Sequence, residues 1–263
     1  MFKSRSSKLI IFSAFLAIAA VLALANARAR RRANFATNGS ALLPRTILWA
    51  WERPTNLSFI DPHNTGVAFL ARTIRLSNEN VSVKPRLQSL TLPAGTPTIA
   101  VARVETDRQV RPIFSVEQRR QLAQAIADMA NLPRISGVQI DFDATLSERD
   151  FYRETIKEVR RLLPLRVSLS ITALASWCMS DDWVSDLPID EAVPMLFRMA
   201  SDGRQIADSL ARGEDFKAAP CRASYGISTD ESSRRLIPTR RLYVFSPEAW
   251  TETSVHQILE SRQ

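Results

Sequence analysis

Residues 136–143 read SGVQIDFD, and apolar and polar side chains alternate along this stretch. Alternation with a period of two is typical of a β-strand, because successive side chains point to opposite faces of a sheet. Positions 138, 140 and 142 would form an apolar face, while Gln139, Asp141 and Asp143 would form a polar one. Neighbouring carboxylates repel one another unless a cation, a donor or water compensates them. Such a strand suits a barrel with a polar upper lumen, and its acids predict a site there.

Similar apolar runs recur along the chain and predict eight strands in all, at residues 47–51, 66–70, 98–105, 137–143, 167–172, 192–197, 224–228 and 241–245. Helical patterns separate several of them. A capping box at Ser115 and Gln118 opens a helix that ends near Ala130, and Ser147 and Asp150 play a similar part before a second helix at 151–163. Two shorter helical patterns lie at 205–210 and 254–259, and no helix is expected within 75–97. Strands that alternate with helices indicate a parallel sheet, so we expect an α/β fold of the (β/α)8 TIM-barrel class.

The first 32 residues differ from the rest of the chain. Seven of the 35 basic residues lie there and flank an apolar run at 9–25. The run fits an uncleaved membrane anchor, which we favour, a cleaved secretory leader or a buried helix. The remaining 28 basic residues nearly balance the 27 acidic ones, which argues against a groove for nucleic acid.

The predicted organisation is therefore a signal or membrane-anchor segment at 1–32, a polar linker at 33–44 and a barrel domain at 45–263. The membrane is an expected partner through the first segment, and no nucleic-acid partner is expected. Charges lie on both sides of the apolar run, so they do not fix its orientation. We expect the barrel to be membrane-anchored or exported, on the periplasmic, extracytoplasmic side.

The cysteines and histidines do not predict a metal site. Cys178 and Cys221 could pair in an oxidising compartment. The strand map, however, places them near opposite ends of the barrel, which argues against a disulfide unless a long connection folds back. Two cysteines are too few for a four-ligand zinc site, and His63 and His256 are far apart in the sequence. No glycine-rich nucleotide loop follows a strand, so we predict neither a metal nor a cofactor.

The site of an α/β barrel lies at the carboxyl-terminal ends of its strands. Asp141 and Asp143 end the fourth predicted strand and Glu105 ends the third, so these three acids are the predicted catalytic residues. For Glu105 the alternative is a simple ion pair with a neighbouring arginine. The flat faces of tryptophan suit stacking on a sugar ring, and all five tryptophans map to this end of the barrel. The predicted substrate-binding residues are Trp51, Glu52, Gln139, Trp177 and Arg198.

Residues 137–143 resemble the fourth-strand signature Asp-Gly-x-Asp-x-Asp-x-Glu of chitinase-type glycoside hydrolases, family eighteen. Gly137 matches the glycine of that signature and Asp141 its inner aspartate, while Asp143 stands where the family has its acid glutamate. Gln139 and Ser136 replace the outer aspartates, and the shorter Asp143 side chain would lie about one methylene further from a glycosidic oxygen. Residues 48–54, 139–145, 169–178 and 193–199 are similar to a bacterial barrel-fold domain family of unknown function. That likeness implies a barrel and export, but no particular reaction.

Three functions are compatible with these features. The leading hypothesis is a carbohydrate-active barrel, a glycoside hydrolase acting on an envelope or extracellular polysaccharide, with Asp143 as general acid and Asp141 raising its pKa. Glu105, Glu52 or the substrate's own acetamido group would stabilise the oxocarbenium centre. The second hypothesis is a non-catalytic barrel that binds a polysaccharide or oligosaccharide on its tryptophans. The third is a metal-dependent hydrolase in which the acidic cluster holds Mg²⁺ or Ca²⁺.

Overall fold

The computed structural model describes residues 43–181, 183–231 and 237–260. The predicted anchor and nearly all of the predicted linker lie outside these residues. Among the helices of the described part, none has both the length and the hydropathy that crossing a bilayer requires.

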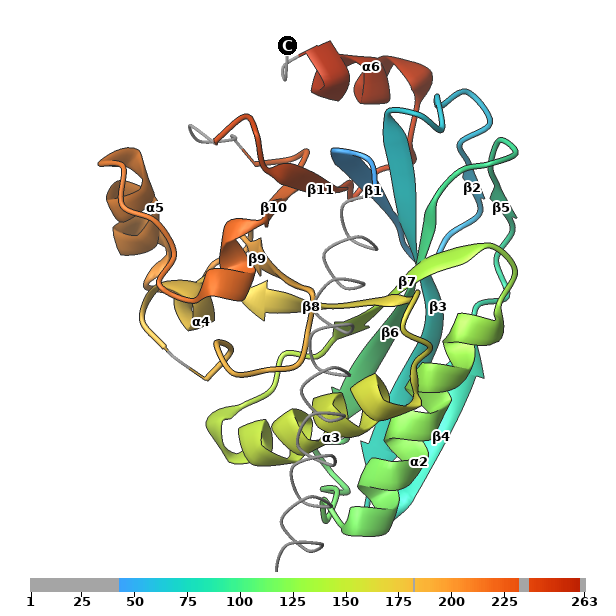
Figure 1. The fold of residues 1–263 in the computed structure, drawn as a ribbon, viewed down its shortest axis with the longest axis vertical. Helices are drawn as coiled ribbons and strands as arrows, with labels where there is room; N and C mark the ends of the chain where they lie inside the picture. Colours follow the sequence, from blue (N-terminus) through green and yellow to red (C-terminus); the bar gives the residue numbers. More distant parts are fainter. Residues whose placement is uncertain (1–42, 182, 232–236, 261–263) are drawn as a thin grey trace, which may run out of the picture.

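Eight parallel strands close into a barrel, as the sequence predicts (Figure 1). Each strand pairs with the next, and β1 pairs with both the second strand and the last, which leaves no open edge between them. The predicted boundaries agree within a few residues except for the second strand, which is much longer. The eight strands are β1 (Thr46–Ala50), β3 (Thr65–Ser77), β6 (Thr98–Thr106), β7 (Ile135–Asp141), β8 (Ser168–Leu174), β9 (Glu191–Met195), β10 (Ser224–Ser228) and β11 (Arg241–Phe245).

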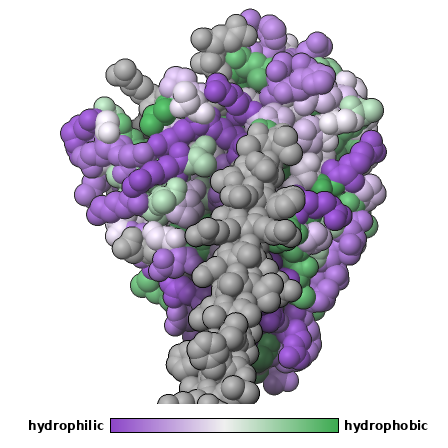
Figure 2. Space-filling view, viewed as in Figure 1, coloured by the Kyte–Doolittle hydropathy of each residue, from purple (hydrophilic) through white to green (hydrophobic). Residues whose placement is uncertain are grey.

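Helices lie in the connections from β6 to β10, and α6 follows β11. Helix α2 and helix α3 contact one another on the outside of the barrel (Figure 1). Both have an exposed polar face, and Figure 2 shows that the visible surface is mostly hydrophilic, with apolar residues in separated patches. The helical elements are α2 (Val116–Ala127), η1 (Asp128–Asn131), η2 (Leu146–Glu148), α3 (Arg149–Leu162), α4 (Ala175–Met179), α5 (Gly203–Ala211), η3 (Ala219–Arg222) and α6 (Glu252–Glu260).

Strands replace helices in the first two connections of the barrel. Between β1 and β3 lies the short strand β2 (Thr55–Asn56), and between β3 and β6 lie β4 (Asn80–Pro85) and β5 (Leu90–Thr91). Strand β4 pairs antiparallel with the far end of β3, and β2 pairs with β5. The expectation that 75–97 contains no helix is confirmed. The turn between β3 and β4 places Asn78 at a φ of 47°, a left-handed conformation that asparagine tolerates better than most residues.

The alternation in β7 separates two apolar cores. Val138 and Ile140 belong to the large core between the strands and the outer helices. The opposite faces of the strands fill the lumen, where Trp49 and Tyr243 pack with smaller side chains. Gly226 leaves room for this packing, because a Cβ there would lie only 3.0 Å from the Trp49 ring.

The first predicted capping box is confirmed in part. The Ser115 hydroxyl accepts the Gln118 N–H at 3.1 Å, but the Gln118 carboxamide oxygen accepts the N–H of Phe114, not that of Ser115. Its amide nitrogen donates to the carbonyls of Asn78 and Asn80, so it ties α2 to the turn of the β3–β4 hairpin.

The second box is wrongly placed. The capping box lies two residues earlier, at Thr145 and Glu148, where the carboxylate accepts the Thr145 N–H at 2.7 Å. The chain turns directly after β7, so the helical region begins earlier than the apolar pattern indicates.

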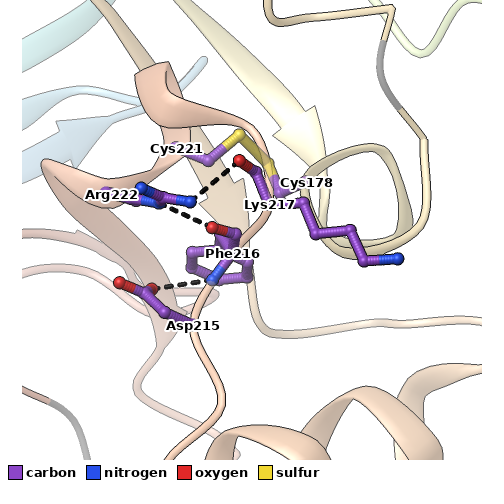
Figure 3. Close-up of a disulfide and its surroundings, with 6 residues drawn as sticks. All are labelled: Cys178, Asp215, Phe216, Lys217, Cys221 and Arg222. Atoms are coloured by element: carbon purple, nitrogen blue, oxygen red, sulfur yellow. Dashed lines mark hydrogen bonds between the residues drawn. A yellow bond between two sulfur atoms is a disulfide. The ribbon is translucent and has the colours of Figure 1, made fainter.

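Cys178 and Cys221 form a disulfide with a Cα–Cα distance of 5.9 Å, so the expectation that they lie at opposite ends of the barrel is wrong (Figure 3). The β9–β10 connection is long and folds back beside α4. A long connection that folds back is the one arrangement in which the sequence analysis allowed a disulfide. There the N–H of Lys217 donates to the Cys178 carbonyl at 2.9 Å. The Arg222 guanidinium fastens the same segment by donating to the carbonyls of Phe216 and Lys217, as Figure 3 shows.

Candidate functional site

A pocket of about 530 Å³ opens at the carboxyl-terminal ends of the strands, a volume in the range of small-molecule sites. We call it the aromatic pocket, because four aromatic side chains line it. Its walls come from β1, β6, β7, β8, β9 and β11, from α4 and α5, and from the connection between β9 and α5. The lining residues are Trp49, Trp51, Arg103, Asp141, Asp143, Thr172, Leu174, Ala175, Ser176, Met195, Phe197, Arg198, Met199, Ala200, Asp202, Ile206 and Phe245.

Trp49 lines the pocket from the lumen of the barrel, and Gln139 lies beneath it. The Trp49 indole N–H donates to the Gln139 carboxamide oxygen at 2.8 Å, and the Gln139 amide donates to the Ser170 hydroxyl at 3.2 Å. Gln139 is fully buried and does not line the pocket. The structure therefore places this predicted substrate-binding residue beneath the site, where it fixes the orientation of Trp49.

Asp141 lies in the pocket with both carboxylate oxygens occupied. Arg103 donates to one oxygen at 2.7 Å, and the Thr172 hydroxyl donates to the other at 2.7 Å. The Asp141 side chain is only 6% exposed, so the guanidinium compensates a carboxylate that has little contact with water. This pairing leaves Asp141 little freedom and makes it part of the frame of the site.

Asp143 has a different environment although it lies only two residues further on. Its side chain is exposed at the pocket mouth, and it accepts no hydrogen bond from the described residues. Partial loss of hydration and, secondly, the Asp141 carboxylate raise the pKa of Asp143 above its ordinary value, while Arg103 opposes the shift. Two adjacent carboxylates with such different surroundings are typical of a site that separates an acid role from an electrostatic one.

Glu105 lies outside the aromatic pocket. Its carboxylate accepts from Arg103 at 3.3 Å and from Arg75 at 3.4 Å, which agrees with the ion-pair alternative for this residue. It lines a second cavity of about 560 Å³ that we call the polar hollow. The residues that line the polar hollow are Arg75, Arg103, Val104, Glu105, Thr106, Asp107, Arg108, Gln109, Phe142 and Asp143.

Three aromatic rings form one wall of the aromatic pocket. Phe197 and Phe245 lie parallel with an interplanar angle of 2° and centroids 5.8 Å apart. Trp51 meets Phe245 edge-on at 6.3 Å, and the Arg103 guanidinium lies 5.9 Å from the Trp51 ring. Trp51 is thus in the pocket, as the sequence predicts. The rings present an apolar surface beside charged groups, an arrangement that suits a ligand with both kinds of face.

Arg198 also lines the pocket, as predicted. Its guanidinium lies 5.1 Å from the Phe245 centroid and 3.6 Å from an Asp230 oxygen. Its backbone is left-handed, with a φ of 50°, and its N–H donates to the Glu231 carboxylate at 2.9 Å. Such a conformation is unfavourable for arginine, so the contact with Glu231 helps to hold the side chain at the mouth of the pocket.

Arg86 holds the segment that carries Trp51. Its guanidinium donates to the carbonyls of Ala50, Trp51 and Arg53, and burial lowers its pKa. Three backbone carbonyls at and beyond the end of β1 are thereby satisfied by one side chain from the connection between β4 and β5. The sequence pattern gave no sign of this role.

Besides Gln139, two predicted substrate-binding residues, Trp177 and Glu52, lie outside both cavities. Trp177 is 3% exposed and packs edge-on against Trp183 at 4.9 Å, in the outer core. It is on α4 and belongs to the outer core, not to the lining of the pocket. Glu52 lines neither cavity, and its carboxylate accepts from Lys84 at 3.0 Å.

Phe245 and Asp202 are pocket residues that the sequence analysis missed. Phe245 is two positions after Tyr243 in β11, so the period of two that identified Asp141 would also have placed it inside the barrel. Asp202 is the residue before α5, and an aspartate before a helical pattern signals a helix start near the strand ends.

The chemistry of the site depends on its carboxylates and aromatic rings. Within the described ranges, no three histidine, cysteine or acidic side chains are grouped so that they could hold a metal ion. The Arg103 guanidinium lies between Asp141 and Glu105 and makes the contacts that a cation between them would make.

Neither the protein-family models nor the curated proteins include a match to the chain.

Proposed function

We propose that the protein is an exported or membrane-anchored carbohydrate-active barrel, a glycoside hydrolase that acts on an envelope or extracellular polysaccharide. One observation carries the proposal: the exposed carboxyl of Asp143, whose pKa is raised, lies at the mouth of an aromatic pocket, beside an Asp141 carboxylate that accepts a hydrogen bond from Arg103. The pocket is at the end of the barrel where α/β barrels have their active sites.

The aromatic wall supports the choice of a sugar as ligand. The C–H faces of a pyranose ring are apolar, and they can pack against the exposed parts of Trp51, Phe197 and Phe245. The hydroxyl groups at the edge of the ring would then meet Arg198 and the carboxylates. A few polar groups that converge in a mostly apolar pocket are the usual composition of a specific ligand site.

The difference between the two aspartates supports hydrolysis. Asp143 would protonate the oxygen of the leaving group, because its raised pKa favours the protonated form. Asp141 keeps its hydrogen bonds and provides a fixed negative charge near the oxocarbenium centre. Asp202 of the same pocket or the substrate's own acetamido group would stabilise the oxocarbenium centre directly. Glu105 and Glu52, the earlier candidates, lie outside the pocket and are ion-paired.

The disulfide supports export. Structural disulfides persist in oxidising compartments and are rare in the cytosol, and both Cys178 and Cys221 are fully buried. This agrees with the leader or anchor expected at residues 1–32. It also agrees with the proposed relation to a bacterial barrel-fold family of exported proteins.

The test is a screen of the purified full-length chain for release of reducing ends from a panel of bacterial polysaccharides. We expect Asp143→Asn to abolish release and to retain binding. Asp150→Asn is the matched control, because Asp150 is almost fully exposed on α3 and lines neither cavity. Trp51→Ala should weaken binding. Release that survives in the Asp143→Asn variant would exclude the assignment of the acid.

The second candidate function is glycan binding without hydrolysis. It is favoured by the predominance of aromatic and aliphatic residues in the pocket and by the full engagement of Asp141. This function predicts that no polysaccharide yields reducing ends. It also predicts that Asp143→Asn and the parent bind equally well, while Trp51→Ala binds weakly.

A further inference from the structure

The aromatic pocket and the polar hollow adjoin one another at the mouth of the barrel. Arg103 and Asp143 line both cavities, so they form the boundary between them. The two volumes, about 530 and 560 Å³, are similar, and each is in the range of a complete ligand site. The proposed acid is therefore at the middle of a longer binding surface and not at its closed end.

The polar hollow has the opposite chemistry to the aromatic pocket. A turn after β6 forms its wall, and the Asp107 carboxylate holds this turn by accepting the N–H groups of Gln109 at 2.8 Å and Val110 at 3.0 Å. The turn leaves Arg108 and Gln109 exposed along the hollow. Arg108 forms no hydrogen bond or ion pair with the described part of the chain, so its guanidinium donors are available to a ligand.

This division matches the two surfaces of a sugar chain. Apolar ring faces pack on aromatic side chains, whereas hydroxyl groups need donors and acceptors. The aromatic pocket offers the former, and the polar hollow offers the latter through guanidinium, carboxylate and carboxamide groups. A single monosaccharide would use one cavity and leave the other filled with water.

We propose that the ligand is a saccharide chain that spans both cavities, with one unit in the aromatic pocket, the next in the polar hollow and the linkage between them beside Asp143. The inference rests on the proposed function and gives the enzyme a binding cavity on each side of the bond that it cleaves. In the reaction the bond between the anomeric carbon and the glycosidic oxygen breaks, and that oxygen takes the Asp143 proton. Water provides the hydroxyl group of the new reducing end, and its remaining proton restores the acid.

The test uses the full-length chain and an array on which each glycan is present as one to six units. We expect affinity to rise at least about tenfold from one unit to three, equivalent to about 1.4 kcal/mol. Arg108→Ala should lower the ratio of affinity for three units to that for one. Arg111→Ala is the matched control, because Arg111 is an exposed arginine five residues beyond β6 that lines neither cavity.

The outcomes separate the inference from the function on which it rests. Equal affinity for one unit and for longer chains would overturn the two-cavity site and leave the proposed function standing. A fall in the ratio with Arg111→Ala as large as with Arg108→Ala would also overturn it, because the effect would then be one of general charge. Absence of binding to every glycan at every length would overturn both proposals.

Discussion

Reduction of the Cys178–Cys221 disulfide should destabilise the barrel strongly. The two cysteines are 43 residues apart in the sequence, and the bond closes a loop that contains β9 and α5. In the chain-entropy description, a cross-link over a loop of this length lowers the entropy of the unfolded chain by an amount worth about 4 kcal/mol at 25 °C. A protein domain is typically stable by about 5–15 kcal/mol, so the bond accounts for a large part of the total.

Urea unfolding of the oxidised and the reduced full-length chain measures this difference directly. Trp49, Trp177 and Trp183 are buried, so intrinsic fluorescence should change on unfolding. With an m-value of about 3 kcal/mol/M, a loss of about 4 kcal/mol lowers the midpoint by about 1.3 M urea. The double variant Cys178→Ala/Cys221→Ala is the control, and the reductant should leave its midpoint unchanged.

Two results would refute this reasoning. A difference of less than about 1 kcal/mol between the two forms would mean that the unfolded chain gains little freedom when the link is cut. Detection of two reactive thiols in the unfolded, unreduced chain would mean that the cysteines do not pair. Glycan affinity should be measured on the same samples, because α4 supplies Ala175 and Ser176 to the aromatic pocket.

Three other perturbations test the site. Arg86→Ala should lower the free energy of unfolding in urea by about 1–3 kcal/mol, because three backbone carbonyls around Trp51 lose their donor. It should also weaken glycan binding, because Arg86 holds the segment that carries Trp51, and unchanged affinity would contradict that role. The proposed acid must be protonated to act, so the rate of hydrolysis should fall as pH rises through the raised pKa of Asp143. The contribution of Asp143 to the free energy of unfolding is fully present below the pKa that this residue has in the unfolded chain. It is lost as pH rises through the higher pKa of the folded protein, and NMR titration of the Asp143 carboxyl measures that pKa. A chelator should leave binding and turnover unchanged, because Arg103 already lies between the two carboxylates; a loss restored by Mg²⁺ or Ca²⁺ would contradict this.

The strand pattern could be predicted from the sequence because it is local. Residues 136–143 alternate with a period of two, and in the structure Val138 is in the outer core while Gln139 is in the lumen. The same parity predicted that Asp141 would face the pocket. Local patterns fail where a side chain depends on a different element. The outer half of β3 carries Arg75, which pairs with Glu105, and the short strand predicted there did not include it.

The sequence by itself determined the number and order of the barrel strands, the face on which each β7 side chain lies and the position of the acids at the strand ends. These follow from the period of side chains along an extended backbone. Only the tertiary structure decided which charges meet, where Trp177 packs and how Cys178 reaches Cys221. These contacts join residues that are far apart in the chain, and their geometry depends on how the connections fold over the barrel and not on any pattern within a single segment.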